Sequence, residues 1–250
     1  MYDIAFISYK EKNANNNFLK LLSHILPKNN RIFRIENVEG IHSAHIEAAK
    51  QVNTPMFYVV DADAKLLPNF KFDITLDPSE EDIVHVWRSI NPINYLEYGY
   101  GGVKLLPRNL TLNMDTTNPD MTTSISSRFK AIEEVSNITA FNTDPLSTWR
   151  SAFRECAKLA SRTISGQLDN ETAHRLNVWT HIGGDKPFGE YAKGGASAGE
   201  WFGKTYKDNK EMLAKINNYE WLASEFYGHI EMFPPETFKG DWPLEEKSQL

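Results

Sequence analysis

Residues 56–63, MFYVVDAD, decide the fold class of this chain. The five apolar residues from Met56 to Val60 predict a β-strand that is covered on both faces, as a central strand of a parallel sheet is. Two carboxylates, Asp61 and Asp63, follow where this strand ends. In open α/β sheets ligands bind beyond the carboxyl ends of the strands, so we expect this acidic pair to lie at the functional site.

The segments before this strand alternate between strand and helix patterns. Strands are predicted at 3–9 (DIAFISY) and 32–37 (IFRIEN), and helices at 18–26 and 42–51. Such alternation implies parallel strands joined by right-handed crossovers. We therefore predict an α/β, Rossmann-like fold with a mostly parallel central sheet and flanking helices.

The rest of the chain gives a coarser pattern. Strands are predicted at 83–88 (IVHVWR) and 103–107 (VKLLP), with a turn-rich stretch between them. Asp144-Pro145 has the form of a helix start, and the helix is predicted to run to Ala160. The glycine-rich run from Gly183 to Gly203 predicts a loop broken by short helical pieces.

Composition restricts the class of protein. The 250 residues are 41% hydrophobic and 24% charged, which suits one globular domain. A single cysteine, Cys156, excludes an internal disulfide and a cysteine-based zinc cluster, and it favours a reducing compartment. No apolar run approaches the roughly 20 residues of a membrane span, and the N-terminus lacks a secretory pattern, so we expect a soluble, cytoplasmic protein. The net charge of −6 argues against a generally basic nucleic-acid coat.

The acidic pair has one clear chemical use. Two Asp residues one position apart, at the end of a strand, are able to ligate a hard divalent cation, Mn²⁺ or Mg²⁺, that also holds a diphosphate. The alternative is that Asp61 caps a turn and Asp63 is merely solvated.

The order of elements and the sequence Asp61-Ala62-Asp63, a DXD motif, resemble nucleotide-sugar glycosyltransferases of the GT-A fold. The resemblance implies a single GT-A domain over residues 1–233, followed by a loosely held polar tail at 234–250. Within that domain it implies a nucleotide-binding half at 1–77 and an acceptor half at 78–233. The implied donor is a nucleotide sugar, with a UDP-sugar favoured, and the implied reaction is hexosyl or pentosyl transfer.

A second segment, THIGGDKPFGEY at 180–191, is similar to the C-terminal His-Gly-Lys-Pro-aromatic motif of retaining GT-A enzymes. The similarity implies that His181 completes the metal site, with His229 as the alternative ligand. Lys186 would then meet the diphosphate, and Gly183 and Gly184 would let backbone N–H groups approach it. The segment is one residue shorter than that motif between His and Lys, so a retaining and an inverting outcome both stay open.

The blocks 84–102, 135–156 and 186–192 together look like tailed-phage glycosyltransferases, some of which modify hydroxymethylated bases in phage DNA. This resemblance implies a hydroxymethylated or already glycosylated base in duplex DNA as the acceptor, and the host cytoplasm as the compartment of a phage-encoded chain. The expected acceptor contacts in the first block are Trp87, Arg88, Gly101 and Gly102, although the glycine pair also suits an ordinary hairpin bend.

Four cations recur every fourth residue along the predicted helix after Asp144. They are Arg150, Arg154, Lys158 and Arg162. Residues with this spacing share a helix face, so the stripe would contact successive phosphates of DNA or would simply be a solvated face.

The remaining site predictions rest on position. Ser8, Tyr9, Glu36 and Asn37 end the first two strands and would meet the nucleoside. An inverting enzyme needs a carboxylate that accepts the proton of the acceptor hydroxyl, and Asp144 is the candidate, with helix N-capping as its other role. Three other functions stay open: a glycosyltransferase acting on a saccharide, a nucleotidyltransferase, and a non-catalytic DNA-binding accessory protein.

Overall fold

The computed structural model describes residues 1–25, 30–99, 101–164 and 166–233, so the predicted tail at 234–250 lies outside the described residues. In the N-terminal part, β1 (Asp3–Ser8), α1 (Ala14–Ile25), β2 (Ile32–Glu36), α2 (Ile41–Gln51), β3 (Met56–Asp61) and β4 (Ala64–Leu66) follow one another. A 3-10 turn (Pro78–Glu80) then leads to β5 (Val84–Ile90), β6 (Glu97–Tyr98), β7 (Val103–Pro107), α3 (Arg108–Leu112), α4 (Met121–Ile125) and β8 (Phe129–Thr139). The C-terminal part is helical, with α5 (Pro145–Ser161), α6 (Asp169–His181), α7 (Gly189–Thr205), α8 (Lys210–Ala214), a 3-10 turn (Lys215–Asn217) and α9 (Tyr219–Met232).

The strands form one mixed sheet in the order β2-β1-β3-β7-β5-β8-β4, with β6 paired to β5. The α/β class and the flanking helices are confirmed, and β1, β2 and β3 are parallel as predicted. Strand β7 runs antiparallel to both β3 and β5, because the short connection from β5 through β6 leaves no room for a crossover helix. Strands β4 and β6 are also antiparallel to their neighbours, so the sheet is mixed and the prediction of a mostly parallel sheet is wrong.

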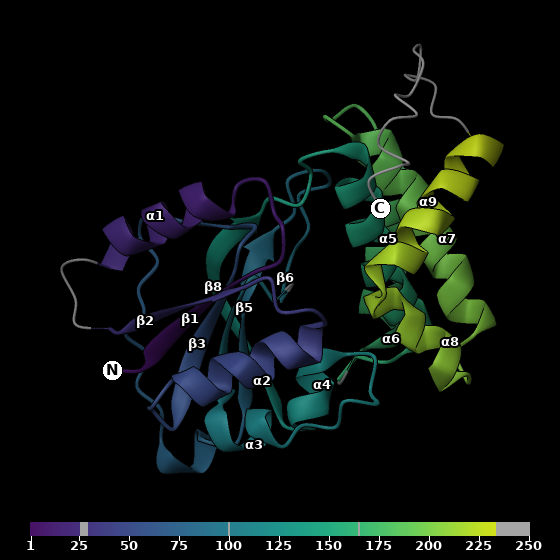
Figure 1. Cartoon of the computed structure of the whole chain (residues 1–250). Coiled ribbons are helices and arrows are strands. Elements are labelled where there is room, and N and C mark those ends of the chain that lie inside the picture. Colours follow the sequence, from purple (N-terminus) through teal and green to yellow (C-terminus); the bar gives the residue numbers. More distant parts are fainter. Residues whose placement is uncertain (26–29, 100, 165, 234–250) are drawn as a thin grey trace.

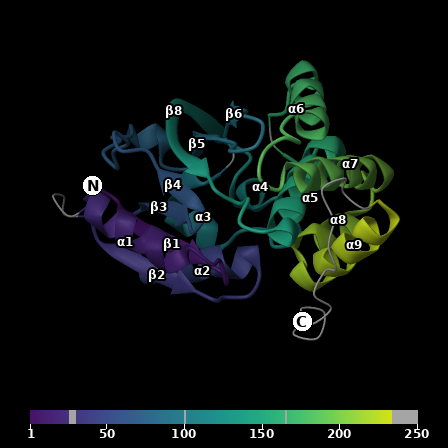
Figure 2. The same ribbon diagram turned by 90° about the horizontal axis from the view of Figure 1, so that it is seen from above.

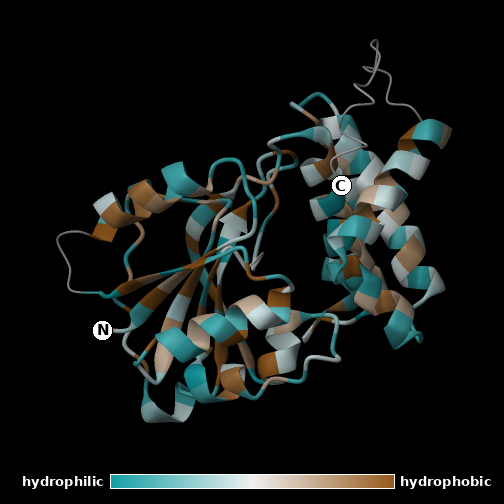
Figure 3. Cartoon of the chain, in the orientation of Figure 1, coloured by the Kyte–Doolittle hydropathy of each residue, from teal (hydrophilic) through white to brown (hydrophobic). Residues whose placement is uncertain are grey.

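Helices cover the sheet on both faces (Figure 1), and β3 is buried from Met56 to Val60. Helix α1 packs on one face, where Tyr58 and Trp87 lie in the core, and α2 with α3 packs on the other, where Phe57 and Val59 lie. Hydrophobic residues accordingly follow the strands, whereas the covering helices carry hydrophilic residues as well (Figure 3). The continuous apolar run of β3 thus reflects coverage of both faces.

Helices α5 to α9 lie together beside the sheet (Figure 2), with two hydrophobic cores of their own. The position predicted to divide the two halves, residue 77, lies between β4 and β5, and these strands belong to the same sheet. The change from sheet to helices comes between β8, which ends at Thr139, and α5, which begins at Pro145. In the described part of the chain, no helix combines the length and the apolar character that a membrane span requires.

The prediction of a loop over Gly183–Gly203 is wrong for most of that run, because residues 189–205 form the continuous helix α7. Gly195, Gly199 and Gly203 recur every fourth residue and face α5. A Cβ at these positions would collide with the backbone oxygens of Trp149, Phe153 and Ala157, respectively. The glycines therefore allow the two helix backbones to approach closely, and this packing offsets their low helix propensity.

Candidate functional site

Strands β1, β3, β5 and β8 all end at one edge of the sheet, which we call the carboxyl edge. This follows from the pairings, since β1 is parallel to β3, β5 is parallel to β8, and β7 is antiparallel to both β3 and β5. The loop at 9–13, the acidic pair and the segment that leads into α5 therefore meet at this edge. The predicted location of Asp61 and Asp63 at the carboxyl edge agrees with the structure.

Asp61 is held by a buried lysine of the neighbouring strand. Lys104 Nζ lies 2.8 and 2.9 Å from the two carboxylate oxygens of Asp61 and also donates to the carbonyl of Gly101. The backbone N–H of Asp61 donates to the carbonyl of Gly102 at 3.0 Å. These hydrogen bonds link Asp61 to β7 and to the turn at Gly101 and Gly102.

Asp63 carries the clearest electrostatic perturbation at this edge. Its backbone carbonyl accepts a hydrogen bond of 2.7 Å from the N–H of Ala140, just after β8. Burial, followed by the negative charges of Asp61 and Glu11, raises the pKa of Asp63 from 3.8 to about 7. A shift of this kind at a strand end marks a candidate functional site.

Glu11 is a third carboxylate at this edge, and sequence reasoning missed it. Its side chain accepts a hydrogen bond from the backbone N–H of Tyr9 in the loop after β1. Burial raises its pKa, the charge of Asp61 adds to this effect, and the charge of Arg150 opposes it. Glu11 is a candidate site residue only because it lies near the acidic pair in the folded chain. In the sequence it is a single Glu in a loop, and no motif distinguishes it from other loop carboxylates.

The perturbed carboxyl of Asp63 has a measurable cost to stability. Between about pH 4 and pH 7 the unfolded chain has released this proton while the folded chain keeps it, so the free energy of unfolding falls as the pH rises through this window. We expect Asp63→Asn to be more stable than the wild type at pH 8 by on the order of 2 kcal/mol, a value reduced from the full shift because solvent reaches part of the residue.

Urea unfolding at about pH 4 and pH 8 measures this difference, with exposed Asp208→Asn as the control. An advantage of Asp63→Asn that is equal at both pH values would contradict the assignment.

Asp144 caps helix α5, as one of its two predicted roles requires. It accepts hydrogen bonds of 2.8 Å from the backbone N–H and 2.9 Å from the hydroxyl of Ser147, and Lys12 Nζ lies 3.5 Å from its carboxylate. Burial opposes ionisation, but the hydrogen bonds from Ser147 and the charge of Lys12 outweigh it and lower the pKa of Asp144. The Lys12 contact joins the loop after β1 to the start of α5.

The residues predicted to meet the nucleoside lie side by side at the ends of β1 and β2. The N–H of Asn37 donates to the carbonyl of Ser8 at 2.9 Å, and Ser8 itself is buried. Glu36 is exposed and pairs with Arg34 at 2.7 Å. The ring of Tyr9 packs edge-on against Tyr219 of α9, with the centroids 5.6 Å apart.

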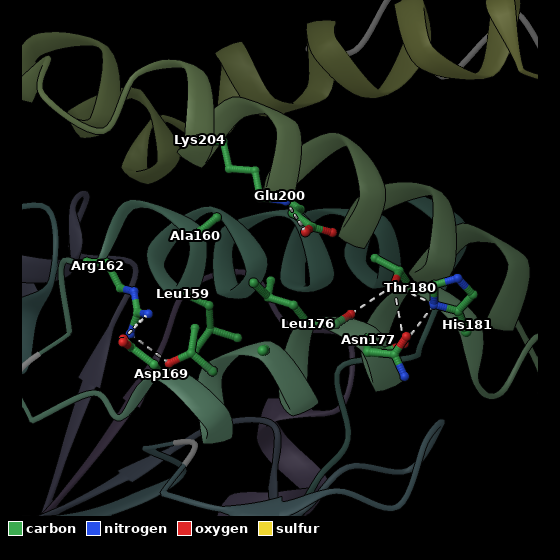
Figure 4. Close-up of a pocket in the computed structure, with 12 residues that line it drawn as sticks. Leu159, Ala160, Arg162, Asp169, Leu176, Asn177, Thr180, His181, Glu200 and Lys204 are labelled. Atoms are coloured by element: carbon green, nitrogen blue, oxygen red, sulfur yellow. Dashed lines mark hydrogen bonds and ion pairs between the residues drawn. The ribbon is translucent and has the colours of Figure 1, made fainter.

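His181 lies at the last turn of α6, where its Nδ1 is 2.9 Å from the carbonyl of Asn177. It lines a pocket of about 360 Å³ formed by α5, α6 and α7, and neither Asp61 nor Asp63 lines that pocket. His181, Thr180 and Asn177 mark one end of the pocket and the Arg162–Asp169 ion pair marks the other (Figure 4).

The alternative ligand, His229 of α9, packs against the ring of Trp149 in α5, and burial lowers its pKa. Among the described residues no three His, Cys, Asp or Glu side chains converge as a metal-binding group.

The segment at 183–188 packs against the loop that follows β5. A Cβ at Gly183 would collide with the backbone oxygen of Ile93, and Lys186 Nζ lies 5.4 Å from the ring centre of Tyr95. Lys186 also pairs with Asp185 at 3.1 Å. A Cβ at Gly184 would meet the carboxylate of Glu190.

The predicted acceptor residues of the first block differ in their accessibility. Trp87 is 2% exposed and packs among Tyr58 and Phe70, so it is a core side chain. Gly102 is in close contact with the side chain of Asn137, which a Cβ would displace. The side chain of Arg88 is 41% exposed, with Glu133 at 3.9 Å. Arg88 is therefore the accessible cation of this block.

The four cations of the predicted stripe contact the protein itself, and Arg162 lies just beyond α5, which ends at Ser161. Arg154 donates to the carbonyl of Ile216 at 2.8 Å, Lys158 lies 3.4 Å from Asp120, and Arg162 pairs with Asp169. The guanidinium of Arg150 lies 4.0 Å from the ring centre of Tyr219, and its charge reaches Glu11. The stripe thus helps to fix α5, and Arg150 is its member nearest to the carboxyl edge.

No protein-family model matches the chain, and no curated protein matches it in sequence.

Proposed function

We propose that this chain is a metal-dependent glycosyltransferase of the GT-A fold that transfers a sugar from a nucleotide-sugar donor, with a UDP-sugar favoured, to an acceptor hydroxyl. The observation that carries the proposal is the acidic pair at the carboxyl edge, where ligands bind in open α/β sheets, with the pKa of Asp63 raised by burial and by the charges of Asp61 and Glu11. Two cations suit a diphosphate: Arg150, whose charge acts on Glu11, and Lys12, which lies 3.5 Å from Asp144 in the loop after β1.

The donor set fits Mn²⁺ or Mg²⁺. Asp61 and Asp63 supply carboxylate oxygens. Burial and then the charges of Asp61 and Glu11 raise the pKa of Asp63, and a bound cation would relieve the repulsion between these charges. Mg²⁺ is commonly held by one or two carboxylates together with substrate phosphates and water. A bound metal would neutralise the negative charge of the leaving diphosphate.

The chain's own residues orient the donor in this proposal. Ser8 and Tyr9 at the end of β1, with Asn37 after β2, would contact the nucleoside, and Arg150 would contact the diphosphate. The pairing of Asp144 with Lys12 fixes the start of α5, from which Arg150 projects. The roles of Asp144 as general base and of Lys186, Gly183 and Gly184 at the diphosphate stay predictions.

The test is a donor screen. Incubation with UDP, GDP and ADP sugars and Mn²⁺, followed by measurement of free nucleotide, should show release from one donor class. Release of diphosphate from a nucleoside triphosphate would instead favour a nucleotidyltransferase. DNA binding with no turnover of any donor would favour an accessory protein.

For the acceptor we propose a hydroxymethylated or already glycosylated base in phage DNA, on the sequence resemblance. Of the predicted acceptor cations, Arg88 suits a phosphate contact best, because Arg154 and Lys158 are engaged within the protein. Such contacts would position the duplex and would not read its sequence.

Arg88→Ala should weaken transfer to hydroxymethylcytosine DNA and reduce the slope of log affinity against log salt by about 1, since one phosphate contact is lost. Donor hydrolysis without DNA should be unaffected. The exposed Lys20 of α1 provides the matched control, as Lys20→Ala. An unchanged salt slope in Arg88→Ala would remove Arg88 from the acceptor site, and a saccharide acceptor would be tested next.

A further inference from the structure

Lys104 is a buried cation in an otherwise apolar strand. The residue is 3% exposed, and the other four residues of β7 (VKLLP) are apolar and buried. A buried charge is costly unless it is paired and hydrogen-bonded. Lys104 meets this need through both carboxylate oxygens of Asp61 and the carbonyl of Gly101. The function proposed above assigns it no role.

The strand register explains how Lys104 reaches the acidic pair. Lys104 is the register partner of Val59 on β3 and of Val86 on β5, so it lies between two buried strands. From there its ammonium reaches the last residue of β3, Asp61. The Asp61 side chain is 36% exposed, whereas that of Lys104 is 4% exposed. The lysine therefore approaches Asp61 from the protein interior, and the solvent side of the carboxylate stays accessible.

We propose that Lys104 is an internal cation that competes with a divalent metal for Asp61. This inference rests on the proposed metal-dependent function. With an ammonium 2.8 Å from its carboxylate, Asp61 attracts a second cation less strongly. The charge of a nucleoside diphosphate compensates this repulsion, so Lys104 makes tight metal binding depend on the donor.

The competition is tested by titrating the protein calorimetrically with MnCl₂ alone, in the absence of nucleotide. Lys104→Met should bind Mn²⁺ about tenfold or more tightly than the wild type, because a positive charge next to Asp61 is removed. Lys104→Arg keeps the charge and should bind like the wild type. Lys65→Met, an exposed lysine of β4, is the matched control.

If Lys104 had a purely structural role, its replacement by Met would leave the affinity for Mn²⁺ unchanged or lower it. Equal or weaker Mn²⁺ binding by Lys104→Met would overturn the inference. If Lys104→Met does not fold, Lys104→Gln decides by the same criterion, since glutamine keeps a donor and lacks the charge. Absence of Mn²⁺ binding in these variants also overturns the inference.

The donor screen separates this inference from the proposed function. Metal-dependent nucleotide release by the wild type, with no gain in Mn²⁺ affinity in Lys104→Met, refutes only the role of Lys104. Tighter Mn²⁺ binding in Lys104→Met, with no nucleotide released from any sugar donor, refutes the glycosyltransferase and leaves the competition standing.

Discussion

Asp63→Ala is expected to lose nucleotide release from the sugar donor by about 10³-fold or more. In the proposed reaction the leaving diphosphate gains negative charge, and the acidic pair would hold the cation that neutralises it. Charge stabilisation by such a metal supplies several kcal/mol, and each 1.36 kcal/mol corresponds to about tenfold in rate. The loss should appear in Mn²⁺-dependent binding of the nucleoside diphosphate as well.

The matched control for this variant is Asp208→Ala, an exposed aspartate near the end of α7. Calorimetry of UDP binding with and without Mn²⁺ and a nucleotide-release assay should be performed on both variants. Folding of Asp63→Ala is verified by its urea unfolding transition. A folded Asp63→Ala that retains metal-dependent nucleotide binding would exclude the acidic pair as the metal site.

The second large effect concerns the contact between α5 and α7. Gly199→Ala is expected to destabilise the protein by about 2–3 kcal/mol, because its Cβ would collide with the backbone oxygen of Phe153. The collision involves a backbone atom of α5, so it is relieved only if α5 and α7 move apart. Gly228→Ala in α9 is the control, since a Cβ at this position meets no atom within 4 Å.

Replacement of this unconstrained helical glycine should stabilise the protein by roughly 0.5–1 kcal/mol. Denaturant unfolding of the two variants measures the change in the free energy of unfolding, which should be negative for Gly199→Ala and positive for Gly228→Ala. A neutral or stabilising Gly199→Ala would show that the two helices are not in backbone contact.

The same glycines show why part of the fold was not predictable from the sequence. The run at 183–203 predicts a loop because glycine has a low helix propensity. The close approach to α5 that favours a helix at Gly195 and Gly199 is a tertiary property, which no local pattern contains. The start of α5 was predictable, because Asp144 and Pro145 are local capping signals.

The candidate site also contains residues that could be predicted from the sequence and residues that could not. The position of Asp61 and Asp63 at the carboxyl edge follows from one apolar strand and the general rule for α/β sheets. The sequence shows Lys104 as a lysine within an apolar strand. Its partner, Asp61 on β3, became apparent only from the register of β7. Glu11 left no signal that separates it from other loop carboxylates.

Arg150, Arg154 and Lys158 lie in α5 at the predicted spacing, whereas Arg162 follows the last residue of the helix. The partners of these cations are internal. Tyr219 and Ile216, which contact Arg150 and Arg154, follow them by more than 60 residues. Sequence spacing gives the face of a helix, and only the packed structure shows what that face contacts.

The decisive experiment measures the mass of hydroxymethylcytosine duplex DNA after incubation with the wild type, Mn²⁺ and each nucleotide sugar. If the protein is a glycosyltransferase that acts on DNA, the mass increases by one sugar residue per modified base with one donor. The increase should be matched by release of the nucleoside diphosphate and should be absent with Asp63→Ala. Failure of every nucleotide sugar to yield either the mass increase or free nucleotide, with this DNA and with saccharide acceptors, would contradict the proposed function.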